Sequence, residues 1–435
     1  MLKRIKIQGY KSLVDLEVHL NPLSLLFGPN AGGKSNFLDA LQLLSRIAES
    51  RTLKNAFEPP YRGKPLESFT FGDNGIKGLL GLETASFSIE VDVQLSGTVV
   101  EVVNRQIREM KKSKPAENVE EAEIKTQSFV RETNLRYRIE IEILPKSGIL
   151  RVADEYLAAL NTKGEISRKR SPFLGKVQNR LHLRMEGQAH PTYYERYLDH
   201  SILSMPLYPP HYPHLVAIRQ ELSRWFFFYF EPRERMRAPT SVKEVHHIGL
   251  MGEELASFLN TLRALDEPQF KAVEKALRMI IPSVTKIDVG VNDLGEVELK
   301  LVEGKTPIPA RVLSEGTLRV LGLLALGGAK DPPSLIGFEE PENGIHPRRI
   351  RMVADLLKNR TLTGETQLIV TTHSPILPEM FSDENLFVCR KEERRTVIKP
   401  FSTWGLLKRR NGIGEAVDAE ELSVSERILR GDFDA

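Results

Sequence analysis

The sequence predicts an α/β fold built around a phosphate-binding loop, and three observations predict it. Residues 28–35 read Gly-Pro-Asn-Ala-Gly-Gly-Lys-Ser, which fits the pattern G-x-x-x-x-G-K-[ST]. Short apolar runs of buried-strand type precede this loop and recur late in the chain, where polar residues follow them. Residues 85–95 and 135–143 alternate apolar and polar side chains, as half-exposed strands of an antiparallel layer do.

The flanks of the loop predict a strand, a glycine loop and a helix. An apolar run at 23–27 precedes it, and residues 36–47 carry apolar side chains at helical spacing. Glycines let the backbone N–H groups curl toward phosphate oxygens, Lys34 reaches the β- and γ-phosphates, and the Ser35 hydroxyl ligates Mg²⁺. The alternative is a glycine turn with a surface lysine. The predicted nucleotide-binding residues here are Gly28, Pro29, Asn30, Ala31, Gly32, Gly33, Lys34, Ser35 and Asn36.

A second apolar strand, 335–338, ends in two carboxylates, Glu339 and Glu340. Beside a phosphate-binding loop, the first acid is expected to hold Mg²⁺ and the second to polarise an attacking water. Asp is more usual than Glu at the first position, but the longer side chain still permits contact with the ion through water. Strand ends are often charged, so the two acids indicate a magnesium site only because a phosphate-binding loop accompanies them.

His373 follows a third apolar strand, 367–372, and ligands of open α/β sheets bind at the carboxyl ends of strands. A neutral imidazole there is able to hydrogen-bond a γ-phosphate or the attacking water. The alternative is a structural turn residue.

Ser314, Glu315 and Gly316 open an apolar helix over 318–326. The free N–H groups of a helix start make an anion site. In isolation, the default interpretation is a plain N-cap by Ser314.

In this order the four elements resemble an ABC-type ATPase head of the soluble branch that contains the RecF, SMC and OLD (overcoming lysogenization defect) proteins. The opening of the chain is similar too, because a basic-apolar strand leads into Gly9-Tyr10-Lys11-Ser12. The stretch 339–347, Glu-Glu-Pro-Glu-Asn-Gly-Ile-His-Pro, is particularly like OLD-type and related "predicted ATPase" members. The specific matches cover about residues 1–45 and 310–380.

The resemblance implies a P-loop NTPase with an ABC-ATPase-type head, an antiparallel β layer and an inserted α-rich arm. It implies that the signature helix of one subunit completes the ATP site of another. By match, Ser314, Glu315 and Gly316 contact the γ-phosphate in trans, Glu340 is the general base and His373 is the γ-phosphate switch. Lys11 and Ser12 lie where this branch places a basic contact near the nucleotide. No glutamine stands out in 65–95 as the family's Q-loop residue.

The resemblance also suggests partners. OLD-type nucleases append a metal-dependent Toprim domain after the His-bearing strand, whereas 62 residues follow His373 here. We therefore expect a homodimer or higher homo-oligomer that binds ATP and Mg²⁺ and serves a separate effector in DNA repair or anti-phage defence. A non-catalytic nucleotide switch and a nucleotide-regulated scaffold for the effector remain open as alternatives.

The composition fits a cytoplasmic enzyme. The 435 residues favour two or three domains, and 41% are apolar. No apolar run approaches the roughly 18–20 residues that span a bilayer, so no membrane association is expected. The single cysteine, Cys389, predicts a buried thiol and no disulfide within the chain. With 61 basic and 58 acidic residues, the net charge demands no polyanion partner.

We predict three segments, 1–100, 101–240 and 241–435, with the middle one inserted into the ATPase head. Its expected contents are an exposed charged insertion at 101–131, strands near 135–157 and 225–231, and an irregular α-rich arm over 160–225. The basic run 168–184 in that arm, with Arg168, Lys169, Arg170, Lys176, Arg180 and Arg184, is a candidate DNA contact, and the alternatives are a solvated loop or a contact for an acidic partner. His211 and His214 are spaced like metal ligands, but no cysteine partners accompany them.

Overall fold

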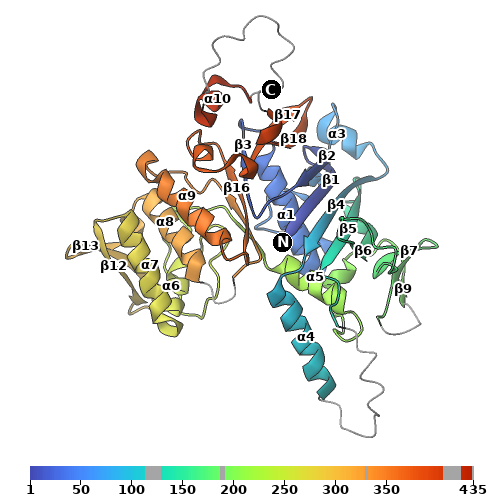
Figure 1. Ribbon diagram of the computed structural model, residues 1–435, viewed down its shortest axis with the longest axis horizontal. Helices are drawn as coiled ribbons and strands as arrows, with labels where there is room; N and C mark the ends of the chain where they lie inside the picture. Colours follow the sequence, from blue (N-terminus) through green and yellow to red (C-terminus); the bar gives the residue numbers. More distant parts are fainter. Residues whose placement is uncertain (113–128, 187–191, 329–331, 405–422, 434–435) are drawn as a thin grey trace, which may run out of the picture. The chain divides into compact units, whose positions relative to one another are not determined.

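The chain folds into two compact units, each assembled from distant parts of the sequence (Figure 1). The first unit comprises residues 1–21, 35–225 and 391–398, and the second comprises 22–34, 226–390 and 399–435. The computed structural model describes residues 1–112, 129–186, 192–328, 332–404 and 423–433.

The first unit contains an eight-stranded sheet in the order β2-β1-β4-β5-β6-β7-β8-β9, and every neighbouring pair is antiparallel. The strands are β1 (Leu2–Tyr10), β2 (Leu13–His19), β4 (Ala85–Gln94), β5 (Asn134–Leu144), β6 (Ile149–Ala159), β7 (Leu174–Val177), β8 (Arg180–Leu183) and β9 (Thr192–Tyr194).

Alternation of apolar residues produces this sheet. Every second residue of β5 is buried, and Ile139 of β5 lies opposite Ile89 of β4. The strands predicted at 85–95 and 135–143, and their antiparallel arrangement, are thus confirmed. The helices of this unit are α1 (Lys34–Glu49, which begins at the last residue of the second unit's loop), α2 (Leu53–Ala56), α3 (Gly75–Leu80), α4 (Gly97–Lys112) and α5 (Pro213–Ser223).

The α-rich arm predicted over 160–225 needs correction. Its described residues hold the short strands β7, β8 and β9, a short 3-10 helix at Ile202–Ser204 and one α-helix, α5, so the segment is mixed. Prolines and aromatic residues in this stretch suggested irregular helix, but Leu174, Leu181 and Leu183 are buried on hairpin strands that extend the sheet. Of the charged insertion predicted over 101–131, the first part belongs to α4, and 113–128 lies outside the described residues.

His214 in α5 has a structural role. Its Nε2 accepts the backbone N–H groups of Arg131 (3.2 Å) and Glu132 (3.0 Å), and its Nδ1 lies 2.8 Å from both carboxylate oxygens of Glu186. Since Nε2 accepts, Nδ1 carries the proton and donates. The ring is buried and stacks on Phe173.

The second unit is organised on the strands β15, β16, β3 and β17 of a six-stranded sheet, whose full order is β10-β15-β16-β3-β17-β18. Strands β15, β16, β3 and β17 run parallel to their neighbours in that order. Every residue of β3, β15 and β16 is buried, as expected for a parallel sheet covered on both faces. The strands are β3 (Leu23–Phe27), β10 (Trp225–Phe228), β15 (Leu335–Glu339), β16 (Gln367–Thr372), β17 (Leu386–Glu392) and β18 (Arg395–Pro400).

A smaller antiparallel sheet and a group of helices complete the second unit. Helices α6, α7, α8 and α9 lie side by side in Figure 1 and share an apolar core with the parallel strands. The remaining elements are β11 (Thr240–Ser241), β12 (Val284–Val291), β13 (Glu296–Glu303), β14 (Thr306–Pro309), α6 (Leu255–Leu265), α7 (Glu267–Ile280), α8 (Glu315–Ala325), α9 (Pro347–Thr361) and α10 (Val424–Arg430).

The register of the parallel strands brings their carboxyl ends to one edge. Glu339 at the end of β15 lies beside Thr371, and Thr372 at the end of β16 lies beside Phe27, which ends β3. The glycine loop after β3, the acids after β15 and the histidine after β16 therefore leave the sheet at the same edge.

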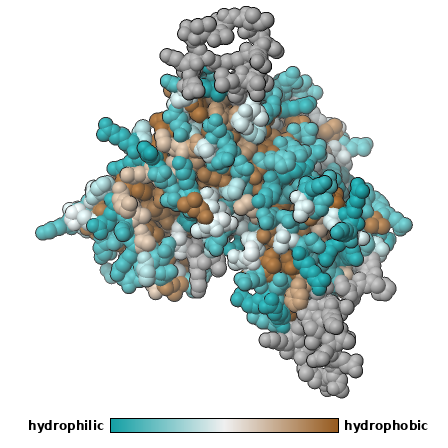
Figure 2. Space-filling view, viewed as in Figure 1, coloured by the Kyte–Doolittle hydropathy of each residue, from teal (hydrophilic) through white to brown (hydrophobic). Residues whose placement is uncertain are grey.

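The predicted fold class is confirmed as mixed α/β with an antiparallel sheet, whereas the division into segments at 100 and 240 stays a prediction. On the face drawn in Figure 2, hydrophobic residues are scattered among predominantly hydrophilic ones. None of the described helices is long and apolar enough to cross a membrane.

Candidate nucleotide-binding site

The glycine loop connects the end of β3 to the start of α1. Gly28 and Gly33 have φ values of +144° and +107°, which side-chain-bearing residues rarely adopt. A Cβ atom at Gly28 would lie 2.1 Å from the backbone oxygen of Cys389, and one at Gly32 would lie 2.8 Å from it. The loop is thus shaped both by its own backbone and by close packing on β17.

Cys389 is fully buried, which confirms the predicted buried thiol. Burial raises the pKa of this thiol to about 12, against the opposing charge of Lys34. Cys389 is therefore an inert packing residue behind the glycine loop.

Lys34 is 4% exposed, and its ammonium lies inside the loop. Its Nζ lies 2.7 Å from the carbonyl oxygen of Gly28, 2.9 Å from that of Pro29 and 3.2 Å from Nδ1 of His373. Three acceptors match the three protons of an ammonium group. Burial lowers the pKa of Lys34 to about 8, although Cys389, Glu340 and Glu339 act in the opposite direction.

His373 connects this lysine to Glu340. When the charged Lys34 donates to Nδ1, the other ring nitrogen carries the proton, and Nε2 then donates to the Glu340 carboxylate 3.1 Å away. The hydrogen bond from His373 is the main cause that holds the pKa of Glu340 below its usual value, with desolvation acting against it. Glu340 is therefore ionised at neutral pH, as a general base must be.

Glu340 adopts an unusual backbone conformation. Its φ is +49°, in the left-handed region that costs a non-glycine residue about 1 kcal/mol. Its N–H group donates to the Thr371 carbonyl of β16 (2.9 Å), and Asn343 Nδ2 donates to its Oε2 (3.3 Å). Such strain is often retained at functional sites, where it aims a side chain.

The groups that would hold Mg²⁺ are oxygen donors of the kind this ion prefers. Glu339 is buried at the carboxyl end of β15, and Ser35 is the second residue of α1, directly after Lys34. Mg²⁺ is commonly held by one or two such protein oxygens together with phosphate oxygens and water. The glycine cradle, the buried ammonium and these donors fit a magnesium–nucleotide complex.

The signature segment opens α8. Ser314 is the N-cap, and its Oγ accepts the N–H of Thr317 (3.1 Å). A Cβ at Gly316 would lie 2.4 Å from the carbonyl oxygen of Gly344, so this glycine allows the segment after Glu340 to touch the helix start. Glu315 pairs with Arg233 at 2.9 Å. Ser314 is thus the N-cap that the alternative interpretation described, and the role of the segment in trans stays a prediction.

Lys11, Ser12 and Asn36 are brought together with α1 within the first unit. Asn36 donates to the Ser12 hydroxyl at 2.8 Å, and that hydroxyl lies 2.7 Å from Thr396 Oγ1. The Lys11 ammonium lies 2.8 Å from the carboxylate of Asp39, which is in the second turn of α1. Its φ of +46° turns the chain between β1 and β2. The structure thus gives Lys11 a carboxylate partner that the sequence pattern did not indicate.

Sequence reasoning missed two buried charged residues near the site. Glu342 accepts a hydrogen bond from the Thr372 hydroxyl, and burial raises the pKa of its carboxyl. Arg319 lies one turn into α8, and burial lowers the pKa of its guanidinium while Glu315 and Glu340 oppose that shift. The sequence signal that could have indicated Glu342 is the run Glu-Glu-Pro-Glu at 339–342. The signal for Arg319 is its spacing of four residues from Glu315, which places both side chains on one face of a helix.

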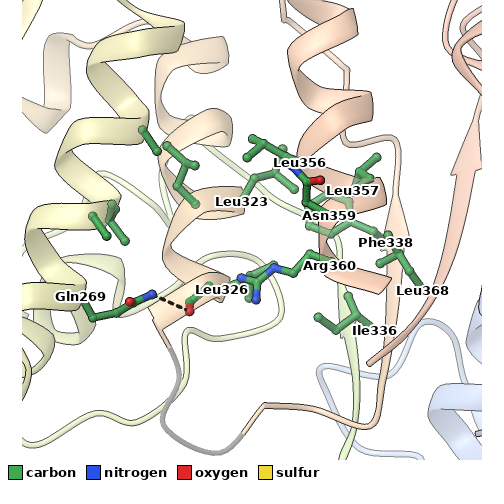
Figure 3. A pocket seen from close by; sticks show the side chains of 15 residues that line it. Gln269, Leu323, Leu326, Ile336, Phe338, Leu356, Leu357, Asn359, Arg360 and Leu368 are labelled. Atoms are coloured by element: carbon green, nitrogen blue, oxygen red, sulfur yellow. Dashed lines mark hydrogen bonds between the residues drawn. The ribbon is translucent and has the colours of Figure 1, made fainter. Parts of the chain in front are cut away.

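An apolar cavity of about 290 Å³ lies between α7, α8, α9 and the strands β15 and β16 (Figure 3). Gln269 donates to the Gly327 carbonyl at 2.9 Å at one side, and Arg360 extends along another. None of the predicted nucleotide-binding residues lines this cavity. It is therefore separate from the candidate nucleotide site.

Comparison with protein families gives two matches that divide the chain. Residues 1–163 match a model described as "AAA ATPase domain", and residues 208–377 match one described as "AAA domain, putative AbiEii toxin, Type IV TA system". The first includes the glycine loop, and the second includes the signature segment, the paired acids and His373. Both matches support an ATP-binding ATPase. No curated protein matches the chain.

Among solved structures, an SMC head bound to the C-terminal winged-helix domain of ScpA is similar at 12% identity and a TM-score of 0.47, covering 92% of this chain and 97% of that one. An Smc head domain with an extended coiled coil, bound to the C-terminal domain of ScpA from Pyrococcus furiosus, is similar at 11% identity and a TM-score of 0.46, covering 92% of this chain and 95% of that one. The SMC head domain from Thermotoga maritima is similar at 14% identity and a TM-score of 0.40, covering 92% of this chain and 98% of that one.

The glycine loop, the paired acids and His373 thus lie at one edge of a parallel sheet, within segments that two ATPase family models match. The predicted resemblance to an ABC-type ATPase head of the RecF/SMC-like branch is supported by these two family matches.

Proposed function

We propose that this chain binds and hydrolyses ATP with Mg²⁺, dimerises head to tail around the nucleotide, and controls a separate effector. One observation carries the proposal. A phosphate-binding lysine is connected through one imidazole to an ionised glutamate, with contacts of 3.2 and 3.1 Å, at the edge where the glycine loop begins.

Each residue has a distinct task in the proposed reaction. Lys34 neutralises charge on the β- and γ-phosphates, and the loop amides orient them. Glu340 accepts the proton of the attacking water, and His373 orients this base through Nε2. Mg²⁺, held by Ser35 and Glu339, would stabilise charge on the phosphate oxygens.

A triphosphate that engages Lys34 competes with the contacts this ammonium now makes. As the ammonium turns from the Gly28 and Pro29 carbonyls and from His373 toward phosphate oxygens, Nδ1 of His373 loses its donor. Nδ1 then carries only a lone pair, so the imidazole donates to the γ-phosphate only after it takes up a proton at Nδ1 or turns its Nε2–H away from Glu340. Loss of the Lys34 contact is thus a physical reason for the predicted switch role of His373.

The exposed signature segment supports dimerisation. Ser314 is exposed, whereas Lys34 is buried among groups of its own chain. In the proposed dimer, Ser314, Glu315 and Gly316 of one subunit complete the site built on Lys34 of the other. The match of residues 208–377 to a family described as a putative AbiEii toxin of a Type IV TA system favours a defence role over DNA repair for the effector. A cytoplasmic location is part of this proposal.

Turnover distinguishes the proposed enzyme from its alternative, a nucleotide switch that only dimerises. We expect Mg²⁺-dependent phosphate release by the purified chain, abolished in Glu340→Gln. ATP-dependent dimerisation without phosphate release would instead favour the switch.

The effector is sought by purifying the tagged chain from its native cells with and without ATP. Mass spectrometry identifies the bound proteins and mass photometry gives the stoichiometry. A protein retained by the parent and lost in Lys34→Ala is the expected result. Retention that is equal in both would show that the nucleotide does not control the association.

A further inference from the structure

The segment 231–238, which follows β10, is a turn closed by Glu231. The Glu231 carboxylate accepts three backbone N–H groups at 3.0 Å, from Arg233, Glu234 and Arg235. Burial would raise the pKa of this carboxyl, but the three donors outweigh that effect and lower the pKa. The turn therefore has a defined shape, and it presents its arginine side chains from fixed backbone positions.

The turn packs directly on the signature helix α8. Met236 is buried, and a Cβ atom at Gly322 of α8 would lie 2.8 Å from its methyl carbon and 2.6 Å from the Phe230 ring. A glycine at 322 is what permits this close approach. The turn and the helix therefore behave as one packed element.

Arg237 binds the backbone immediately before the signature. Its two terminal nitrogens donate to the carbonyl oxygens of Arg311 (3.1 Å) and Leu313 (2.7 Å). Leu313 precedes the N-cap Ser314. Because a planar guanidinium donates in a fixed direction, the two hydrogen bonds restrict both the position and the orientation of backbone residues 311–313.

Arg233 acts on the side chain of the signature. Its Nε lies 2.9 Å from Glu315 Oε1, and this hydrogen bond raises the pKa of Arg233. The two side chains are 77% and 39% exposed, so the pair adds little to folding stability. Its effect is on local charge, because an unpaired Glu315 carboxylate would repel a polyphosphate brought to the helix start.

We propose that the turn 231–238 is a clamp that positions the signature segment and neutralises Glu315, so that the segment can receive the triphosphate held by a second copy of the chain. Arg237 and Arg233 are positioning residues, since they act through the Leu313 carbonyl and through Glu315. This inference rests on the proposed head-to-tail dimer, but the clamp itself is tested without nucleotide.

The direct test is hydrogen exchange on the full chain in the absence of nucleotide. Arg237→Ala should speed exchange of the amides of residues 314–318 about tenfold, because a charge-assisted pair of hydrogen bonds is lost. Arg235→Ala, a change of an exposed arginine on the same turn, is the matched control and should leave these amides unchanged. If Arg237→Ala does not fold, Arg237→Lys replaces it, with a smaller increase expected. Unchanged exchange in a folded Arg237 variant would overturn the clamp.

A double-mutant cycle on Arg233 and Glu315 tests whether Arg233 neutralises the Glu315 carboxylate. Arg233→Ala should raise the KM for ATP about three- to tenfold with a smaller change in kcat, because Glu315 is left without its cation. In the Glu315→Gln background the same change should have little further effect. Equal effects of Arg233→Ala in both backgrounds would overturn the neutralising role. Failure of the parent to dimerise would count against the proposed function alone, because the exchange result does not depend on it.

Discussion

The P-loop side and the signature side of the candidate nucleotide site differ in how deeply their residues are buried. On the P-loop side, Lys34 is 4% exposed and its ammonium has three partners within its own unit. On the signature side, Ser314 is exposed and the Glu315 side chain is 39% exposed. The first side is complete within one chain, whereas the second is held in position by its neighbours and faces solvent. The difference suggests that one side binds nucleotide alone and the other acts after a second copy arrives.

The largest effect is expected from breaking the P-loop side. Lys34→Ala should lower the ATPase rate by about 10³-fold or more, because the charge that neutralises the β- and γ-phosphates is lost. Lys34→Met, which keeps most of the side-chain volume, should be equally inactive. The measurement is steady-state phosphate release, with the melting temperature as a check on folding. Substantial activity in Lys34→Met would show that the charge is not required.

Glu340→Gln should separate binding from hydrolysis. Hydrolysis should fall by about 10²-fold or more because an amide accepts no proton, while ATP and Mg²⁺ still bind. ATP-bound dimers should then accumulate and be visible by mass photometry. Hydrolysis at the parent rate would show that another residue is the base.

The pH dependence of ATP binding tests the burial of Lys34. Its pKa is lowered to about 8, and the protonated ammonium is the form that binds phosphate. ATP affinity should therefore be nearly constant below about pH 7 and fall by up to tenfold per pH unit above about pH 8. Calorimetry on the Glu340→Gln variant measures this without turnover. The Lys34→Arg side chain stays protonated over this range, so the affinity of this variant for ATP, whatever its size, should not fall with pH. A flat profile in the Lys34 protein would contradict the account.

The smallest effect concerns the exposed basic run of the first unit. Arg168 and Lys169 are exposed, whereas Arg170 pairs with Glu132 at 3.0 Å. If the run binds duplex DNA, changing all three to Ala should flatten the slope of log affinity against log salt by about two units, since Arg170 is already occupied. Basal ATPase should be unaffected. Unchanged DNA affinity and slope would remove this run from the mechanism.

The sequence indicated the parts whose signals are local. The glycine loop, the three apolar strands and the Ser314 N-cap each follow from a few consecutive residues, and the structure has them where they were expected. Their common edge followed from the general behaviour of parallel strands, and the register of Glu339 and Thr372 agrees with it.

What remained hidden depends on contacts between distant residues. The Cys389 carbonyl explains Gly28 and Gly32, yet it lies about 360 positions later in the chain. The Lys34–His373–Glu340 contacts and the Arg237 clamp have the same character. The error over 160–225 arose because short, irregular strands have weak periodicity, and pairing with a sheet decided their conformation.

The composite site is the central claim, and mixing two inactive variants tests it most directly. Ser314→Arg blocks the signature side and Lys34→Ala disables the P-loop side, so each homodimer should be inactive. In verified heterodimers, the account predicts one working site, formed by the intact P-loop of the Ser314→Arg chain and the intact signature of the Lys34→Ala chain, with part of the parent ATPase rate regained. Heterodimers that form with ATP but recover no activity would contradict it.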